Sequence, residues 1–266
     1  YLSTGCSFRS LAFTFRMGIT SVARIVIETC NAIWNILSKV YIPVPTNEMW
    51  KTNAKDFYNK WNFPNCLGSI DGKHVRIDQP EHSGSMYYNY KHFYSINLFA
   101  ISDVNYKFII VDIGAYGRES DGGVLKNSVF FNKLQKKELS IPDDIELPNT
   151  NIIAPYTFIG DEAFPLLINI LRPYPGKQLI NDEKKETNVE HAIVITKAIC
   201  VLHNIVLTYD QQSSQVDNLE GNTSGFGDIG GRKNNRFGRA ARDSREIFTE
   251  YFSSEAGTIP WQLDCI

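Results

Sequence analysis

The chain has 266 residues, 43% of them hydrophobic and 12% aromatic, so it can bury one large core, alone or with a small appendage. Its formal net charge of −2 argues against a large nonspecific DNA footprint, because proteins with such footprints are often strongly basic. Local basic patches remain compatible with that charge. The five cysteines lack framework spacing, and we expect free thiols in a reducing compartment.

The apolar segments and the first residues bear on location. No apolar run approaches the length of a bilayer-spanning helix, and residues 1–5 lack the basic and apolar regions of a signal peptide. We therefore expect no membrane partner. Because residue 1 is not Met, we also expect the natural N-terminus to lie further upstream.

The first 40 residues are predicted to form two helices. Phe8, Leu11 and Phe15 follow a helical spacing that ends at Gly18. Thr20 or Ser21 is then expected to cap a second helix, which continues through Ile36. Two helices joined by a glycine-containing turn are typical of a DNA-reading helix-turn-helix, but any packing hairpin of helices gives the same pattern.

A linker and a short helix are predicted next. Pro43, Pro45 and Trp50 indicate the linker, and a helix is expected through Phe57 and Trp61.

Strand-like patterns begin at Gly68. Ser69–Ile77, Phe93–Ser102 and Lys107–Ala115 are predicted to form an antiparallel meander, and Tyr156–Asp161 is a fourth strand. A helix is predicted between the third and fourth strands. This order is that of a ribonuclease-H-like core, in which the fourth strand pairs beside the first.

The remaining elements are predicted to be helices and loops. Ser120 and Asp121 are expected to cap a helix that reaches Leu134. Further elements are expected as a loop over 141–155, helices over 164–171, 188–207 and 240–252, and a flexible segment over 211–235.

Two aspartates carry the strongest chemical signal. Asp71 lies inside an apolar strand and Asp161 ends another, and hard Mg²⁺ or Mn²⁺ prefers carboxylate oxygens. A structural role is the alternative for each: Asp71 as an ion-pair residue near Lys73, Asp161 as a helix N-cap. Asp121 is a third candidate, and it too has an alternative as a helix cap. Asp112, on the third strand, has a position from which it can face the first.

The aromatic and histidine residues are less specific. Tyr87–Tyr94 interleaves aromatic with basic residues, which suits either base stacking or a half-buried hairpin. His74 lies three residues after Asp71 and is expected on the opposite face of the sheet. His203 is expected to be a hydrogen-bonded core residue. The sequence shows no zinc-type Cys/His spacing, nucleophile elbow or P-loop.

Residues 62–75, NFPNCLGSIDGKHV, resemble the opening of the DDE endonuclease domain of PIF/Harbinger-type transposases and their domesticated relatives. The resemblance continues in order through residues 84–91, 119–123, 159–166, 172–176 and 200–204. Residues 4–9 are similar to the start of the helix-turn-helix segment that precedes this domain. Nearly the whole chain is covered.

The resemblance implies an α/β fold with a ribonuclease-H-like (retroviral-integrase-like) mixed sheet flanked by helices. It also implies metal-dependent cutting and joining of DNA with Mg²⁺ or Mn²⁺, and its catalytic and metal-binding acids map onto Asp71, Asp121 and Asp161. Members often rely on a Myb/SANT-like partner protein for DNA binding and nuclear entry. We therefore expect DNA and such a protein as partners, and a nuclear location with the cytoplasm as alternative.

The chain departs from the family where the catalytic glutamate is expected. Family members carry that residue on a helix after the Arg-Pro-Tyr-Pro-Gly motif, whereas here the motif runs almost directly into the segment that follows the helix. We infer an internal deletion near residues 184–187. Glu183, Glu186 and Glu190 remain, but none stands in the family's context.

The predicted organisation has four parts. Residues 1–60 form a truncated helix-turn-helix-like segment, 61–210 the internally deleted endonuclease-like domain, 211–235 a flexible loop, and 236–266 a C-terminal helix and tail.

Three hypotheses follow from this organisation. The first is a transposase-derived nuclease impaired by the loss of its glutamate helix. The second is a non-catalytic DNA- or protein-binding module that keeps the fold. The third is a misassembled gene product that folds poorly because the missing helix exposes the core.

Overall fold

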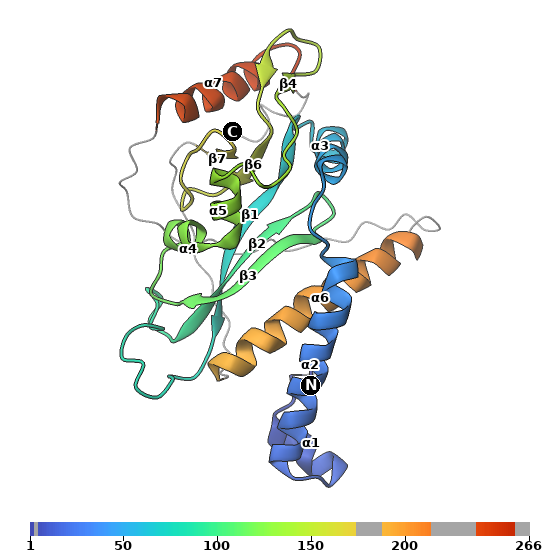
Figure 1. Ribbon diagram of the computed structural model, residues 1–266, viewed down its shortest axis with the longest axis vertical. Coiled ribbons are helices and arrows are strands. Elements are labelled where there is room, and N and C mark those ends of the chain that lie inside the picture. Colours follow the sequence, from blue (N-terminus) through green and yellow to red (C-terminus); the bar gives the residue numbers. More distant parts are fainter. Residues whose placement is uncertain (3–4, 174–187, 214–237, 259–266) are drawn as a thin grey trace.

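The computed structural model describes residues 1–2, 5–173, 188–213 and 238–258. A five-stranded sheet in the order β3-β2-β1-β6-β7 forms its centre, with helices packed around it (Figure 1). The strands of this sheet are β1 Cys66–Arg76, β2 Ser95–Ser102, β3 Phe108–Tyr116, β6 Thr157–Gly160 and β7 Ile170–Leu171. The helices are α1 Phe8–Phe15, α2 Ile19–Tyr41, α3 Asn47–Trp61, α4 Asp121–Asn127, α5 Val129–Gln135, α6 Val189–Ser213 and α7 Arg239–Ser253.

The pairing of the strands confirms the predicted core. β1 and β2 are antiparallel, as are β2 and β3, so the first three strands form a meander. β6 lies beside β1 and runs parallel to it. The mixed five-stranded sheet flanked by helices is the expected ribonuclease-H-like α/β arrangement.

Helices cover both faces of the sheet. Successive side chains of a strand point to opposite faces of the sheet, so the side chains of Ile70 and Asp71 on β1 are on different faces. Ile70 belongs to the main core, where it packs with Phe99 and with Phe130 of α5. On the other face Ala192 of α6 packs against Ile96. These two hydrophobic clusters therefore lie on opposite faces of the sheet.

The N-terminal helices extend away from the sheet (Figure 1). α1 and α2 meet at an angle of 110°, and α2 packs on α6 through Cys30, Ile195 and Ala198. The prediction that Thr20 or Ser21 caps the second helix is wrong, because Gly18 is the N-cap and both residues lie inside α2.

Two predicted boundaries also differ from the structure. Trp50 is not in a linker: Thr46 caps α3, which places the Trp50 side chain in the core at 0% exposure. The predicted helix from Ser120 is interrupted at Ser128, whose side chain accepts a hydrogen bond from the amide of Phe131 and thereby begins α5.

The predicted helix over 164–171 is wrong. Residues 162–169 are irregular, with turns at 162–163 and 168–169, and Ile170 and Leu171 form β7, which pairs with β6 in parallel. Pro165 removes an amide donor, and the amide of Leu167 bonds the carbonyl of Ile170 at 2.9 Å. The loop predicted over 141–155 contains a small hairpin, formed by β4 Ile145–Glu146 and β5 Ile153–Ala154.

One helix corrects the expectation about apolar runs. Residues 189–211 of α6 are long and apolar enough to cross a membrane by length and composition alone. The core helix of a folded domain passes the same test, and α6 packs against the sheet and α2.

The remaining sequence predictions concern thiols and loops. The cysteines within the described part of the chain, Cys6, Cys30, Cys66 and Cys200, are thiols that are not joined in disulfides. The inferred deletion near 184–187 lies outside the described residues, as does the segment predicted to be flexible, apart from residues 211–213 at the end of α6.

Candidate active site

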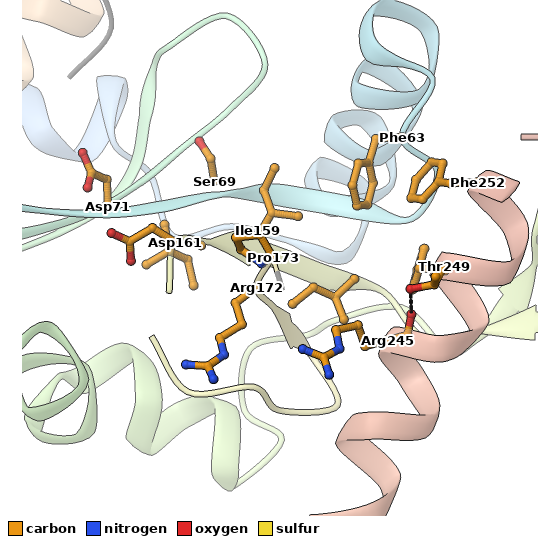
Figure 2. A pocket seen from close by; sticks show the side chains of 14 residues that line it. Phe63, Ser69, Asp71, Ile159, Asp161, Arg172, Pro173, Arg245, Thr249 and Phe252 are labelled. Carbon is orange, nitrogen blue, oxygen red and sulfur yellow. Dashed lines mark hydrogen bonds between the residues drawn. The ribbon is translucent and has the colours of Figure 1, made fainter. Parts of the chain in front are cut away.

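Asp71 and Asp161 meet on neighbouring parallel strands. The last registered pair of β1 and β6 joins Ile70 to Gly160, and each aspartate is the next residue along its chain. Both line a single cavity of about 540 Å³ between the sheet and α7, and Figure 2 shows the two carboxylates at one end of it. The fold therefore brings together the two acids that the strand patterns indicated.

Backbone amides orient both carboxylates. Oδ1 of Asp71 accepts a hydrogen bond from the amide of Gly72 at 2.7 Å, and Oδ1 of Asp161 accepts one from the amide of Ala163 at 2.9 Å. The alternative role of Asp161 as a helix N-cap does not hold, because turns follow it. Each carboxylate has one oxygen in a local backbone bond, which limits its rotation.

Asp121 lies close to this pair but is buried. It is the first residue of α4, where the N-cap is Ser120, and its side chain is 6% exposed. Its carboxylate sits against Gly72, where a Cβ would overlap it. The pKa of Asp121 is raised to about 7, first by burial and then by the negative charges of Asp161 and Asp71. The three acids therefore interact electrostatically.

Metal-binding geometry is incomplete among these side chains. Within the ranges that the structure describes, no three His, Cys, Asp or Glu side chains converge closely enough to hold a metal ion. Asp71 and Asp161 supply two adjacent carboxylates, the donor type that hard divalent cations prefer. The Asp121 carboxylate does not join them, because it lies against Gly72 of β1.

Two arginines line the cavity that were not predicted as site residues from the sequence. Arg172 follows β7, and its Nη1 donates to the carbonyls of Glu162 at 2.8 Å and Phe164 at 3.3 Å. Arg245 reaches the cavity from α7 (Figure 2). Burial and the positive charge of Arg245 lower the pKa of Arg172, while Glu162 and Asp161 act in the opposite direction. Arg172 stood in a recognised motif, whereas Arg245 carried no signal beyond the polar face of its helix.

The other acids considered lie elsewhere. Glu190 is exposed in the first turn of α6, near Ala192, which packs against Ile77 beyond the far end of β1. Asp112 is on β3, which β2 separates from β1. Glu183 and Glu186 lie outside the described residues.

The aromatic segment forms the half-buried hairpin that was one of its two predicted structures. Tyr88 and Tyr94 form a β-bridge, Asn89 is 2% exposed, and Tyr90 is 47% exposed. His74 and His203 are both hydrogen-bonded, to the Ser95 hydroxyl at 2.9 Å and to the Tyr106 carbonyl at 3.0 Å, although His203 is only half-buried.

Comparison with known proteins places this site in a family. A sequence model of the DDE superfamily endonucleases matches residues 70–205, just over half of the chain. The matched segment includes all three aspartates, most of β1, and all of β2, β3 and β6. The chain therefore belongs to the DDE superfamily endonucleases.

Individual relatives agree with that assignment. The chain is 28% identical over 182 residues to "Protein ALP1-like" of Arabidopsis thaliana, an alignment covering 66% of this chain and 43% of that protein. It is 24% identical over 228 residues to "Putative nuclease HARBI1" of Xenopus laevis, covering 76% of this chain and 65% of the relative. The chain thus spans less than two thirds of the length of either relative. No solved structure matches it significantly.

Proposed function

We propose that the chain is a transposase-derived, divalent-metal-dependent DNA nuclease whose present form is impaired. The observation that carries this proposal is the pairing of Asp71 with Asp161 on β1 and β6 of a DDE endonuclease fold. Asp121 belongs to the same charged cluster, since both aspartates raise its pKa. We assign catalytic roles to these three residues, and metal binding to Asp71 and Asp161 among them.

The donor set fits a hard divalent cation such as Mg²⁺ or Mn²⁺. DDE superfamily endonucleases depend on divalent metals, and carboxylates on adjacent strands are suitable ligands. Asp71 and Asp161 would hold the ion, and Asp121 would add negative charge behind them. A metal bound there would polarise a phosphate and help to generate the attacking nucleophile. The protein's own contribution is to orient the carboxylates through the amides of Gly72 and Ala163.

The impairment follows from the absence, among the described residues, of a third carboxylate placed to share the metal with Asp71 and Asp161. Asp121 lies against Gly72, and Glu190 is exposed in the first turn of α6, near Ala192, which packs with Ile77 just beyond β1. A site that positions its metal with two carboxylates should bind it weakly, and losses within such catalytic units are severe. The inferred deletion would also remove a basic DNA-holding stretch, in agreement with the net charge of −2.

The test is cleavage of supercoiled plasmid with Mn²⁺. Four proteins are compared: the unmodified chain, Asp71→Asn, the matched control Asp78→Asn, and a version in which a family-like glutamate helix is restored. Asp78 is an exposed acid just beyond the same strand, so its substitution tests loss of charge without loss of the site.

The outcomes separate the two parts of the proposal. Nicking only after restoration, and its loss on adding Asp71→Asn, would support an impaired nuclease. Strong nicking by the unmodified chain that needs Asp71 but not Asp78 would contradict the impairment alone. Nicking that survives Asp71→Asn in every background would overturn the nuclease assignment.

A non-catalytic binding module is the second candidate function. The α1–α2 arm exposes large apolar side chains, with Phe13 at 88% and Phe15 at 65% exposure, and such surfaces are typical of interaction sites. A Myb/SANT-like partner protein and a nuclear location belong to this hypothesis as well as to the first. Tight DNA or partner binding that is insensitive to EDTA and to Asp71→Asn would favour it.

A further inference from the structure

The cavity beside Asp71 and Asp161 extends well beyond the two carboxylates. Its volume of about 540 Å³ falls within the range typical of small-molecule sites. The carboxylates occupy one end, Arg172 and Arg245 line the middle, and phenyl rings close the other end (Figure 2). A metal and one phosphate would fill only part of this space.

The apolar end is a cluster of three phenylalanines from separate parts of the chain. Phe63 precedes β1, whereas Phe248 and Phe252 lie on α7. The Phe63 ring centroid is 4.8 Å from that of Phe252 and 5.9 Å from that of Phe248. Phe248 is 2% exposed and belongs to the core, while Phe63 and Phe252 are partly exposed. The cluster therefore has partly exposed aromatic surface that packs on a buried side chain.

The middle of the cavity carries positive charge. The two backbone carbonyls that Arg172 bonds fix one edge of its guanidinium. Arg245 stands close enough for its charge to lower the pKa of Arg172. An anion between two like charges relieves their repulsion, and guanidinium groups match the geometry of phosphate oxygens.

We propose that this cavity holds one unpaired nucleotide of the DNA strand, next to the phosphate presented to Asp71 and Asp161. Arg172 and Arg245 bind a phosphate of that nucleotide, and its base lies against Phe63 and Phe252. The inference rests on the proposed nuclease function and names the form of its substrate: a strand with an extruded or single-stranded base at the site.

The chemistry of the three zones supports this ligand. Aromatic side chains bind bases by stacking, and enzymes that act near a base often take it out of the duplex. An apolar peptide or an acyl chain would satisfy the apolar end but would not supply the phosphate that the two arginines match. A nucleotide can contact the carboxylate end, the arginine middle and the phenylalanine end of the cavity in the order in which they lie.

The experiment measures binding of the full chain to fluorescein-labelled duplexes with a short single-stranded 3′ end. Ca²⁺ is used so that binding is read without cleavage. An abasic residue is placed at successive positions of the single-stranded end, and each DNA is tested with the unmodified chain and with Phe252→Leu, which keeps apolar volume but removes the ring. Tyr209→Leu, which removes a ring that is 60% exposed on α6, is the matched control.

We expect one abasic position to weaken binding about tenfold, the effect of losing one stacked base. Phe252→Leu should weaken binding of the intact DNA by a similar factor and leave the abasic DNA unaffected. Arg245→Gln should weaken both DNAs, and Arg242→Gln, an exposed residue of the same helix, should weaken neither strongly. Competition by a free deoxynucleoside monophosphate, with no preference at any position of the strand, would assign the cavity to a free nucleotide instead.

Other outcomes overturn the proposal. Equal binding of intact and abasic DNA at every position, equal effects of Phe252→Leu on both DNAs, or no DNA binding would each do so. Plasmid nicking with no base discrimination would reject the nucleotide pocket but not the nuclease. Base discrimination without nicking in the restored version would reject the nuclease but not the pocket.

Discussion

The carboxylate of Asp121 occupies the space that a Cβ at Gly72 would fill. Gly72 follows Asp71 directly on β1, so the missing side chain lets an acid of α4 approach the strand that carries the first site residue. The Asp-Gly pair is therefore a structural requirement of the three-acid cluster.

Gly72→Ala should displace Asp121 and destabilise the protein by about 1–3 kcal/mol, the usual effect of overpacking a closed site. Urea denaturation gives the loss in unfolding free energy. Gly72→Ala should cost much less in an Asp121→Ala background, because the overlapping carboxylate is then absent. Additive losses in the double variant would contradict the contact as the cause.

The raised pKa of Asp121 predicts a pH-dependent stability of the metal-free protein. The folded state retains a proton on Asp121 up to about pH 7, whereas the unfolded chain releases it near 3.8, the ordinary pKa of this side chain. The stabilisation is fully present below that pH and is lost as pH rises through about 7. The difference between the two pKa values corresponds to about 4 kcal/mol at most.

The measurement compares urea denaturation in EDTA across this pH range for the unmodified chain and Asp121→Asn. Subtraction removes contributions shared by both proteins, including that of Asp103, whose pKa burial also raises. In Asp161→Asn the transition should shift to lower pH, because a charge that raises the pKa of Asp121 is gone. A difference curve that is flat between pH 4 and 7 would contradict the prediction.

The central sheet was predictable because its strands have strong local patterns. The apolar run around Asp71 and the one ending at Asp161 specify β1 and β6, and the order of elements places them together. β7 was missed because Phe164, Leu167 and Leu171 have a helical spacing, while the pairing of Ile170 with Phe158 is a nonlocal contact. Sequence periodicity carries little information about a two-residue strand.

The site was predictable only in part for a related reason. The three aspartates stand in recognisable motifs, but the burial of Asp121 depends on its packing against Gly72 across two elements. Arg245 meets Arg172 only because α7 packs over the edge of the sheet. Such meetings of distant segments leave no periodic signal in the chain.

Trp50 anchors α3 to the loop after α5. Its side chain is fully buried, and its indole Nε1 donates to the carbonyl of Leu139 at 2.8 Å. Trp50→Phe should lower the free energy of unfolding by about 2–4 kcal/mol, because it leaves a cavity and an unsatisfied carbonyl. The matched variant Trp61→Phe, at a residue 50% exposed on the same helix, should cost under about 0.5 kcal/mol. Similar thermal shifts for the two variants would show that the buried bond contributes little.

Asn204 joins three elements through one side chain. Its Oδ1 accepts from the amide of Phe108 at 2.8 Å, and its Nδ2 donates to the carbonyls of Phe108 and Tyr41, each at 2.7 Å. Asn204→Leu keeps the side-chain volume but removes these bonds between α6, β3 and α2. It should lower the free energy of unfolding by about 3 kcal/mol or more. The neighbouring variant His203→Leu removes a single bond, to Tyr106, and should lower the free energy of unfolding by about 1 kcal/mol.

Urea denaturation gives both values, and hydrogen exchange should show faster opening at the C-terminal end of α2 in Asn204→Leu alone. Equal losses, or unchanged exchange in α2, would mean that apolar packing of α2 on α6 holds the arm without this residue.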